Sequence, residues 1–337
     1  MGKTFKILSI DGGGIKGLYT SELLAKLEDT FNARITDYFD MICGTSTGGL
    51  IALAASLGKP MSEVVDFYKK YGASIFDQKV KRTKLGYGSL IFKQTLFNGK
   101  YNGKALKKAL SDVFGNTKIS ESKNFLCIPS YNIISGTPRV FKKDYDDLDQ
   151  DDRKTYVDVA LATSAAPTYF PVKHLDHDFY IDGGVWANNP ILVGLSEYLY
   201  KFSRLEQFSG VDILSVESCE VPKNEAPKRL NRSFLSWNDT LFDIYSHGQS
   251  EFALFLLKML KNQLKFDLNY YRMANNCDIS GEQAKLISMD NASFEAQELL
   301  LGYADHTARN EKKKEEVRRF FTTKKSLTPS EYAKKYK

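Results

Sequence analysis

The chain has 337 residues, of which 42% are hydrophobic and 26% are charged, enough for one large domain or two smaller ones. The net charge of +6 is a mild excess that does not by itself indicate nucleic acid, so no DNA or RNA partner is expected. Four scattered cysteines without a CxxC pair argue against a disulfide framework and against a zinc site. We therefore expect free thiols in a reducing compartment and no bound metal.

The beginning of the chain enters a strand-like run directly, which predicts that there is no secretory signal peptide. No uninterrupted apolar stretch reaches the length of about 18 residues that a membrane-spanning helix needs. These features predict a cytoplasmic protein.

The first predicted elements alternate between strands and helices. A strand at 5–10 is followed by Asp11-Gly-Gly-Gly-Ile-Lys-Gly17 and by an amphipathic helix over about 18–31. A second strand at 39–43 leads through Gly44-Thr-Ser-Thr-Gly48 into an apolar helix at 50–57. This order predicts an α/β fold with a central, mostly parallel sheet that is covered by helices.

The later elements follow the same logic, although the pattern weakens beyond residue 220. Helices are predicted at 61–71, 104–114, 156–162 and from Pro190 to about 200, and strands at 125–134, 138–141, 178–181 and 211–216. A long helix at 241–264, a strand at 268–272 and a closing helix at 294–320 complete the prediction.

Two segments of the sequence are rich in charged residues. The acidic run at 144–152 is predicted to be a solvated loop. Residues 78–108 are basic and aromatic together, and we interpret them as a solvated loop that leads into the helix at 104. Contact of this segment with anionic lipid headgroups is the alternative.

The turn Gly44-Thr-Ser-Thr-Gly48 fits the G-x-S-x-G pattern of a nucleophile elbow. A strand that reverses sharply into a helix strains the central residue and needs neighbours with almost no side chain. Ser46 would then stand at a helix N-terminus, where backbone N–H groups face developing negative charge. An ordinary Gly-rich turn with a surface serine is the alternative.

The glycines of 11–17 are candidates for an oxyanion hole. The N–H groups of Gly12, Gly13 and Gly14 follow a strand and are unshielded by side chains, and the N–H of Thr47 would be a further donor. The same loop also fits the dinucleotide fingerprint G-x-G-x-x-G, which predicts a nucleotide-binding module without hydrolase activity. That alternative requires an acidic residue at the end of the second strand, where this chain has Cys43 and Gly44.

A serine nucleophile needs a base, and two kinds of residue could supply it. A Ser–Asp–His order would use His247 or His306, but both lie in predicted helices, and His174 and His177 lie in a polar turn. Asp182 ends an apolar strand and precedes two glycines, so it could accept the Ser46 proton directly. A simple turn aspartate is the alternative.

Taken together, three motifs resemble those of the patatin-like phospholipase family. They are Asp11-Gly-Gly-Gly-Ile-Lys-Gly17, Gly44-Thr-Ser-Thr-Gly48 and Asp182-Gly-Gly184, and 165–171 and 182–190 also resemble conserved blocks of the family. The resemblance runs from about residue 5 to 200, in the order of the family. It implies a three-layer patatin-like fold, with a catalytic core at 5–201 and a mostly helical C-terminal region at 202–337 packed on the same body.

The resemblance also implies a chemistry: hydrolysis of phospholipid esters through a Ser46–Asp182 dyad and an acyl-enzyme, which releases fatty acids without a metal, a histidine base or a cofactor. Lys16 occupies a position that is often Arg or Lys in the family and is expected near a lipid phosphate. The residues assigned to the site are the nucleophile Ser46, the base Asp182, the oxyanion donors Gly12, Gly13, Gly14 and Thr47, and the motif residues Asp11, Gly17, Gly44, Gly48, Gly183 and Gly184.

The size of the chain and its opening motif further resemble bacterial patatin-like effectors of antiphage defence. That resemblance implies activation by a cyclic nucleotide and peripheral, transient action on phospholipids at the inner membrane. It would give the C-terminal region, which the family motifs leave unexplained, a regulatory role. A homo-oligomer is left open.

Overall fold

The computed structural model describes residues 2–76, 100–221, 231, 234–264, 266–275 and 277–336, and the side chains of 234–240 and 336 are outside this description. The described residues form an eight-stranded sheet in the order β5-β6-β3-β2-β1-β7-β8, with β4 also paired to β3. The strands are β1 (Lys3–Ile10), β2 (Met41–Gly44), β3 (Phe125–Asn132), β4 (Thr137–Phe141), β5 (Lys173–Leu175), β6 (Asp178–Asp182), β7 (Phe208–Val216) and β8 (Asp267–Met273).

The sheet has a parallel half and an antiparallel edge. β1 pairs in parallel with β2 and β7, β2 with β3, and β7 with β8. β4, β5 and β6 add antiparallel pairs beyond β3. The central strand β1 is buried on both faces, with Ile7 in one core cluster and Leu8 and Ile10 in the other. Burial on both faces explains why this strand is an almost continuous apolar run.

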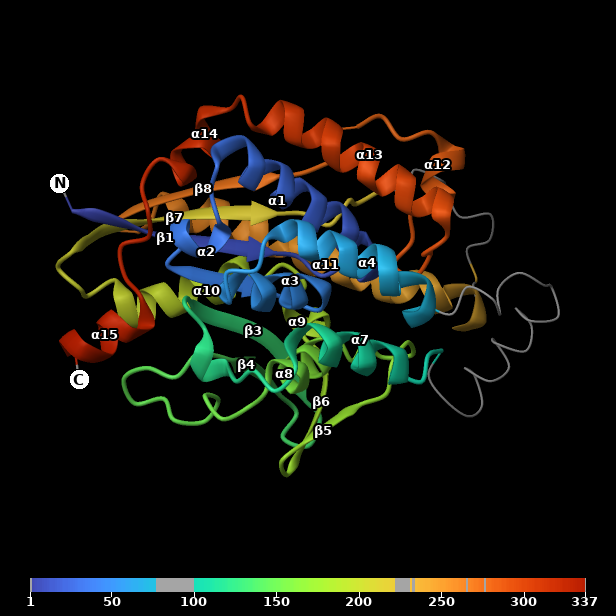
Figure 1. The fold of residues 1–337 in the computed structure, drawn as a ribbon, viewed down its shortest axis with the longest axis horizontal. Coiled ribbons are helices and arrows are strands. Elements are labelled where there is room, and N and C mark those ends of the chain that lie inside the picture. Colours follow the sequence, from blue (N-terminus) through green and yellow to red (C-terminus); the bar gives the residue numbers. More distant parts are fainter. Residues whose placement is uncertain are drawn as a thin grey trace.

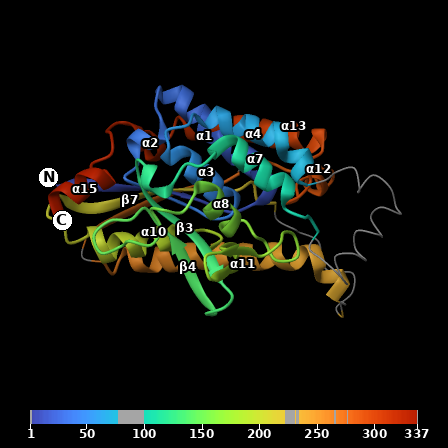
Figure 2. The ribbon, with the colours of Figure 1, turned by 60° about the horizontal axis from the view of Figure 1, so that its bottom comes forward.

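Helices cover both faces of the sheet, as Figures 1 and 2 show. One face carries α1 (Gly17–Phe31), α3 (Thr47–Ser56), α4 (Met61–Ile75), α7 (Lys104–Phe114), α8 (Tyr156–Thr163) and α13 (Phe294–Glu311). The other carries α10 (Ile191–Glu197), the π-helical η3 (Tyr198–Phe202), α11 (Phe234–Lys261) and α15 (Pro329–Tyr336). The predicted α/β fold, with a mostly parallel sheet between two helical layers, is confirmed.

The predicted closing helix at 294–320 is wrong as a single element. α13 ends at Glu311, and after a turn the chain forms α14 (Glu315–Arg318) and η4 (Arg319–Phe321). The turn lets two aromatic rings pack near β2 and α1. The ring centroid of Phe320 lies 5.7 Å from that of Phe39, and the centroid of Phe321 lies 4.7 Å from that of Phe31. The sequence pattern continued in helical period through the turn, so it could not locate the break.

The acidic segment at 144–152 is also not a wholly solvated loop. Asp151 is buried and forms an ion pair of 2.6 Å with Arg139, and Tyr145 belongs to the core cluster beneath α10. In the basic segment, residues 78–99 lie outside the described residues. Lys100 is buried and pairs with Asp290 at 2.7 Å, so its charge is already neutralised inside the protein.

The region after residue 201 contributes strands as well as helices. β7 and β8 extend the same sheet beside β1, and the proposed division at 201 falls inside η3. The division of the chain into two regions therefore stays a prediction.

The four cysteines are free thiols in the structure: Cys43, Cys127, Cys219 and Cys277. None of the helices in the described part of the chain is long and apolar enough to cross a membrane.

Candidate active site

Ser46 lies in the predicted sharp turn between β2 and α3. Its backbone angles are φ 55° and ψ −123°, a strained conformation for a residue with a side chain. A Cβ on Gly44 would lie 2.1 Å from the carbonyl oxygen of Gly48, and one on Gly48 would lie 2.4 Å from that of Ile10. Both glycines are therefore required by the close approach of backbone atoms, as an elbow of this type predicts.

Thr163, the last residue of α8, holds the Ser46 turn in place. Its Oγ1 accepts a hydrogen bond of 3.0 Å from the Ser46 N–H and donates one of 2.5 Å to the Pro129 carbonyl. Its carbonyl accepts from the N–H of Gly183 at 3.3 Å. One side chain and its backbone thus connect the serine turn to the residues after β6. Sequence analysis missed Thr163, because a helical threonine carries no local signal for this role.

Asp182 ends β6 and is almost completely buried, with 1% of its surface exposed. Its Oδ1 accepts a hydrogen bond of 2.7 Å from the Gly184 N–H, whereas Oδ2 is buried with no hydrogen-bond partner among the described residues. Burial raises the pKa of Asp182 to about 7, and the Gly184 N–H and the nearby Ser46 hydroxyl oppose that rise. The fold therefore brings Ser46 and Asp182 together, although no hydrogen bond of normal geometry joins their side chains.

Asn188 occupies the space where the three motifs meet. Its carbonyl accepts a hydrogen bond of 3.1 Å from the Gly12 N–H. A Cβ on Gly12 would lie 2.6 Å from Asn188 Oδ1 and 3.2 Å from Ser46 Cβ, and one on Gly184 would lie 3.4 Å from the same Oδ1. Glycine at these two positions allows the loop after β1 and the turn after Asp182 to lie in contact with the Ser46 turn.

The predicted oxyanion donors differ in their availability. The Gly12 N–H is bonded to Asn188, and the Gly13 N–H donates to Thr47 Oγ1 at 3.1 Å. Thr47 is the first residue of α3, and the first N–H groups of a helix have no acceptor within it. Gly14 has φ +62°, and a Cβ there would lie 2.0 Å from the Met289 carbonyl oxygen. Among the described residues no hydrogen-bond acceptor is found for the N–H of Gly14 or of Thr47, so these two are the better candidates. Gly13 would have to exchange its hydroxyl partner for the oxyanion.

The glycine loop is held from outside by residues of the C-terminal region. Arg272 on β8 forms a bidentate ion pair with Asp11, with N–O distances of 2.8 Å and 2.6 Å. The Ile15 N–H donates to the Met289 carbonyl at 2.8 Å. Burial raises the pKa of Asp11, and the Arg272 charge opposes the rise. Sequence analysis missed these contacts because their partners are more than 200 residues away in the chain.

Lys16 does not point to an open phosphate site. It is buried and forms an ion pair of 2.8 Å with Glu220. Burial favours the neutral amine, but the Glu220 carboxylate outweighs it and raises the pKa of Lys16. Contact between Lys16 and a lipid phosphate stays a prediction, and it would require this ion pair to open.

His174, His247 and His306 lie away from the Ser46 and Asp182 side chains. His247 is exposed on α11, His306 Nδ1 lies 3.1 Å from Cys277 Sγ, and the His174 ring stacks on Phe179. In the described part of the chain, no hydrogen bond joins a histidine to Ser46 or to Asp182. The described residues also contain no group of three or more His, Cys, Asp or Glu side chains that could hold a metal ion.

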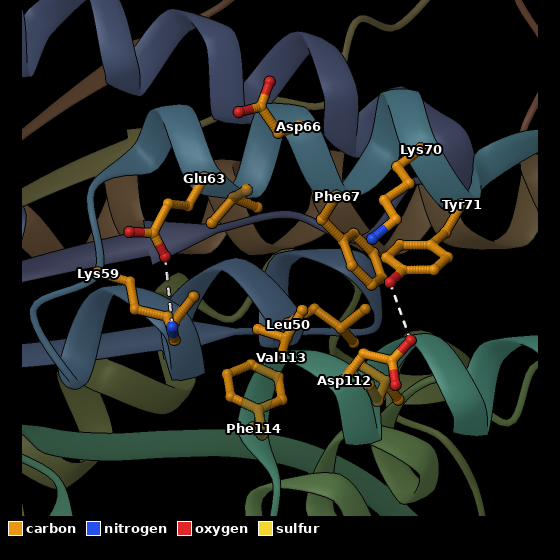
Figure 3. Close-up of a pocket in the computed structure, with 13 residues that line it drawn as sticks. Leu50, Lys59, Glu63, Asp66, Phe67, Lys70, Tyr71, Asp112, Val113 and Phe114 are labelled. Atoms are coloured by element: carbon orange, nitrogen blue, oxygen red, sulfur yellow. Dashed lines mark hydrogen bonds and ion pairs between the residues drawn. The ribbon is translucent and has the colours of Figure 1, made fainter.

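An apolar cavity lies directly beside Ser46. Besides Ser46 and Thr47, its walls include Leu50, Phe67, Tyr68, Phe76 and Phe170. Leu50 and Phe67 also line a second hollow between α3, α4 and α7, whose rim carries Lys59, Glu63, Lys70 and Asp112 (Figure 3). The aromatic and aliphatic lining at the nucleophile suits a hydrocarbon segment of a ligand.

Comparison with known proteins agrees with this geometry. The family model for patatin-like phospholipases matches residues 8–195. A cGAMP-activated phospholipase of Pseudomonas aeruginosa is 30% identical over 309 residues, which cover 90% of this chain and 88% of that protein. A cGAMP-activated phospholipase of Vibrio cholerae is 32% identical over 321 residues, covering 86% of each. Patatin-like protein 2 of Arabidopsis thaliana is 31% identical over 350 residues, covering 90% of this chain and 83% of that protein.

A serine turn on a helix-covered parallel sheet, with a glycine loop and a buried carboxyl beside it, defines an α/β ester hydrolase. The matched residues include all three motifs, and the chain belongs to the patatin-like phospholipase family. The predicted family and enzyme class are confirmed. The dinucleotide alternative for the Gly12–Gly17 loop is disfavoured, because the Met289 carbonyl and Asn188 already fill the space around these glycines.

Proposed function

We propose that this chain hydrolyses ester bonds of membrane phospholipids with Ser46 as nucleophile and Asp182 as the base. The observation that carries the proposal is the position of Asp182, whose buried carboxyl lies beside the Ser46 hydroxyl and has its pKa raised to about 7. A base that titrates near the working pH is well matched to proton transfer.

In the proposed reaction, Ser46 Oγ attacks the carbonyl carbon of a lipid ester and its proton passes to Asp182 Oδ2. The backbone N–H groups of Gly14 and Thr47 stabilise the negative oxygen of the tetrahedral intermediate, together with that of Gly13 once it leaves Thr47 Oγ1. The C–O bond to the leaving alcohol then breaks, and Asp182 returns the proton to the departing lysolipid. Water, deprotonated by Asp182, attacks the acyl-enzyme, and Ser46 recovers a proton as the fatty acid leaves. The apolar side chains of Leu50 and Phe67 contact the part of the acyl chain next to the reacting carbonyl.

The proposal predicts a specific pH dependence. Because Asp182 must be deprotonated to accept the serine proton, kcat/KM should rise with pH and level off above the pKa of about 7. The measurement is kcat/KM for a water-soluble ester across about pH 5 to 9, with the protein shown to be folded at each pH. A profile that is flat across this range would contradict Asp182 as the base.

The same raised pKa has a consequence for stability. Since the folded-state pKa of about 7 lies above the ordinary value of 3.8, ionising Asp182 costs folding free energy as the pH rises between them. Asp182→Asn removes this cost and leaves a side-chain oxygen for the Gly184 N–H. This variant should therefore be no less stable than the parent protein above pH 7, which makes it a sound probe of catalysis.

We further propose that a cyclic nucleotide activates the enzyme, because two relatives are cGAMP-activated phospholipases. In this proposal the activated enzyme degrades phospholipids at the inner membrane in antiviral defence, as a monomer or a homo-oligomer, and the C-terminal region has the regulatory role. The site itself supports regulation, because the loop at Asp11 is held by Arg272 and Met289 of the C-terminal region. A ligand that moves this region would move the glycines beside Ser46.

The experiment is fatty-acid release from phospholipid vesicles in the presence of cGAMP and a panel of other cyclic di- and trinucleotides. We expect release that depends on one member of the panel and that is absent in Ser46→Ala. A fluorophosphonate probe should label Ser46 covalently, which a mere binding module would not allow. Equal release with and without every nucleotide would argue against the switch while leaving the hydrolase intact.

A further inference from the structure

The outer face of α11 is apolar although it is exposed. Six of its large hydrophobic side chains are between 49% and 60% exposed, and they are Leu241, Ile244, Tyr245, Phe252, Phe255 and Met259. Single exposed hydrophobic residues are common, but a row of them on one helix marks an interaction surface. We call these six residues the α11 face. Figure 2 shows α11, in orange, along the outer edge of the helical layer opposite α1 and α4.

The buried side chains on the inner face of the same helix are mostly small, and two of them are polar. Ser246, Ser250, Ala253 and Leu257 are buried, and their spacing of three to four residues places them on one side of the helix. An ordinary surface helix buries its large apolar side chains and exposes its polar ones. Among the described side chains of α11, six large apolar ones point outward instead, so burial against the protein does not explain those six.

The α11 helix lies directly against the catalytic segment. Ser250 Oγ accepts a hydrogen bond of 3.2 Å from Asn188 Nδ2, and Gln249 Oε1 accepts one of 3.0 Å from the Asn189 N–H. The ring of Phe242 lies 3.4 Å from the position of a Cβ on Gly184. Its centroid is also 6.4 Å from that of Tyr169, which lines the cavity beside Ser46. These contacts come from the inner and flanking sides of α11, so they tie the helix to the catalytic segment and leave the α11 face on its outer side.

The charges on this helix suit a lipid surface. Between residues 241 and 261, the exposed charged side chains are Glu251, Lys258 and Lys261, with the two lysines together in the last turn. Exposed Phe, Leu and Tyr side chains, with lysines near one end, form the composition of helices that lie in the plane of a membrane interface. Lys258, at the flank of the α11 face, would face phosphate groups while the rings enter the acyl boundary. Lys261 is turned toward the sheet, with its Nζ 5.9 Å from the centroid of the Tyr270 ring.

We propose that the α11 face rests on the phospholipid bilayer that carries the substrate. The proposal rests on the proposed function, because it assumes that the substrate is a membrane lipid. The residues that would bind the membrane are different from those that catalyse hydrolysis, since none of the six side chains takes part in the chemistry.

The test compares two double variants of the full chain. Phe252→Gln/Phe255→Gln removes two rings from the α11 face, and Tyr200→Gln/Phe294→Gln removes two exposed rings from other surfaces, where the side chains are 65% and 73% exposed. Partitioning is measured on vesicles of diether phosphatidylethanolamine and phosphatidylglycerol, which cannot be hydrolysed, with and without cGAMP. The rate with a water-soluble butyrate ester and the thermal unfolding midpoint are measured in parallel.

We expect the α11 variant to lose at least about tenfold in vesicle partitioning, with its ester rate and unfolding midpoint close to those of the parent protein. The control variant should bind vesicles like the parent protein. The proposal is overturned if the α11 variant partitions normally, or if the parent protein binds no vesicles under either condition. It is also overturned if the substitutions dissociate a dimer instead, because the face then joins two copies of the chain. Absence of ester hydrolysis in the parent protein would refute the proposed function separately, without affecting the binding result.

Discussion

Replacing Ser46 by alanine is expected to lower phospholipid hydrolysis by at least about 10³-fold, because no other group can form the acyl-enzyme. Asp182→Asn should cause a loss of similar size, since the serine hydroxyl is a poor nucleophile when nothing accepts its proton. Both side chains are nearly buried at the junction of β2, β6 and α3, so the substitutions are small changes in a rigid site. The measurement is the initial rate of fatty-acid release under the condition that activates the parent protein.

The combination of the two substitutions distinguishes a dyad from two independent contributions. Residues that act as a unit show losses that do not add, so Ser46→Ala/Asp182→Asn should be no slower than Ser46→Ala alone. His247→Ala and His306→Ala are the controls and should retain the parent rate, because neither ring is bonded to the pair in the described part of the chain. Full activity in Asp182→Asn together with a large loss in either histidine variant would replace the dyad with a triad.

The Ser46 turn and Asp182 could be predicted from the sequence because each is defined by residues that are neighbours in the chain. A strand, a turn with glycines on both sides of Ser46 and an apolar helix are neighbours in the chain, and their arrangement follows from sterics alone. Asp182 was identifiable for a similar reason, because it ends an apolar strand and precedes two glycines. The observed β2, α3 and β6 lie close to the predicted positions of these elements.

The parts that could not be predicted depend on contacts between distant segments. Thr163 and Asn188 are ordinary polar residues in the sequence, and only the fold reveals that they bond to the Ser46 turn and to Gly12. Their roles arise because the end of α8 and the segment after Asp182 meet the turns that follow β1 and β2. The same limit applies to β8, which was predicted as a short strand without any indication that it would bring Arg272 to Asp11.

Arg272→Met is expected to destabilise the protein by about 3–5 kcal/mol, because it leaves the Asp11 carboxylate buried without its partner. Asp11 is 3% exposed, and the guanidinium also donates a bond of 2.8 Å to Ser215 Oγ. The measurement is the free energy of unfolding from urea denaturation. Arg309→Met is the matched control, because Arg309 pairs with Asp305 on the surface of α13, where an ion pair is worth about 1 kcal/mol or less.

A double variant separates the loss of the ion pair from the loss of the arginine itself. Asp11→Asn/Arg272→Met has no buried carboxylate to leave unpaired, so it should recover part of the stability that Arg272→Met loses. Its catalytic rate should nevertheless stay below that of the parent protein, because the Gly12–Gly14 backbone is no longer tied to β8. A cost in Arg272→Met no larger than that in Arg309→Met would show that the pair adds little to folding. In that case the C-terminal region would fix the Gly12–Gly14 loop mainly through two other contacts, the Met289 carbonyl with the Ile15 N–H and the Lys16–Glu220 ion pair.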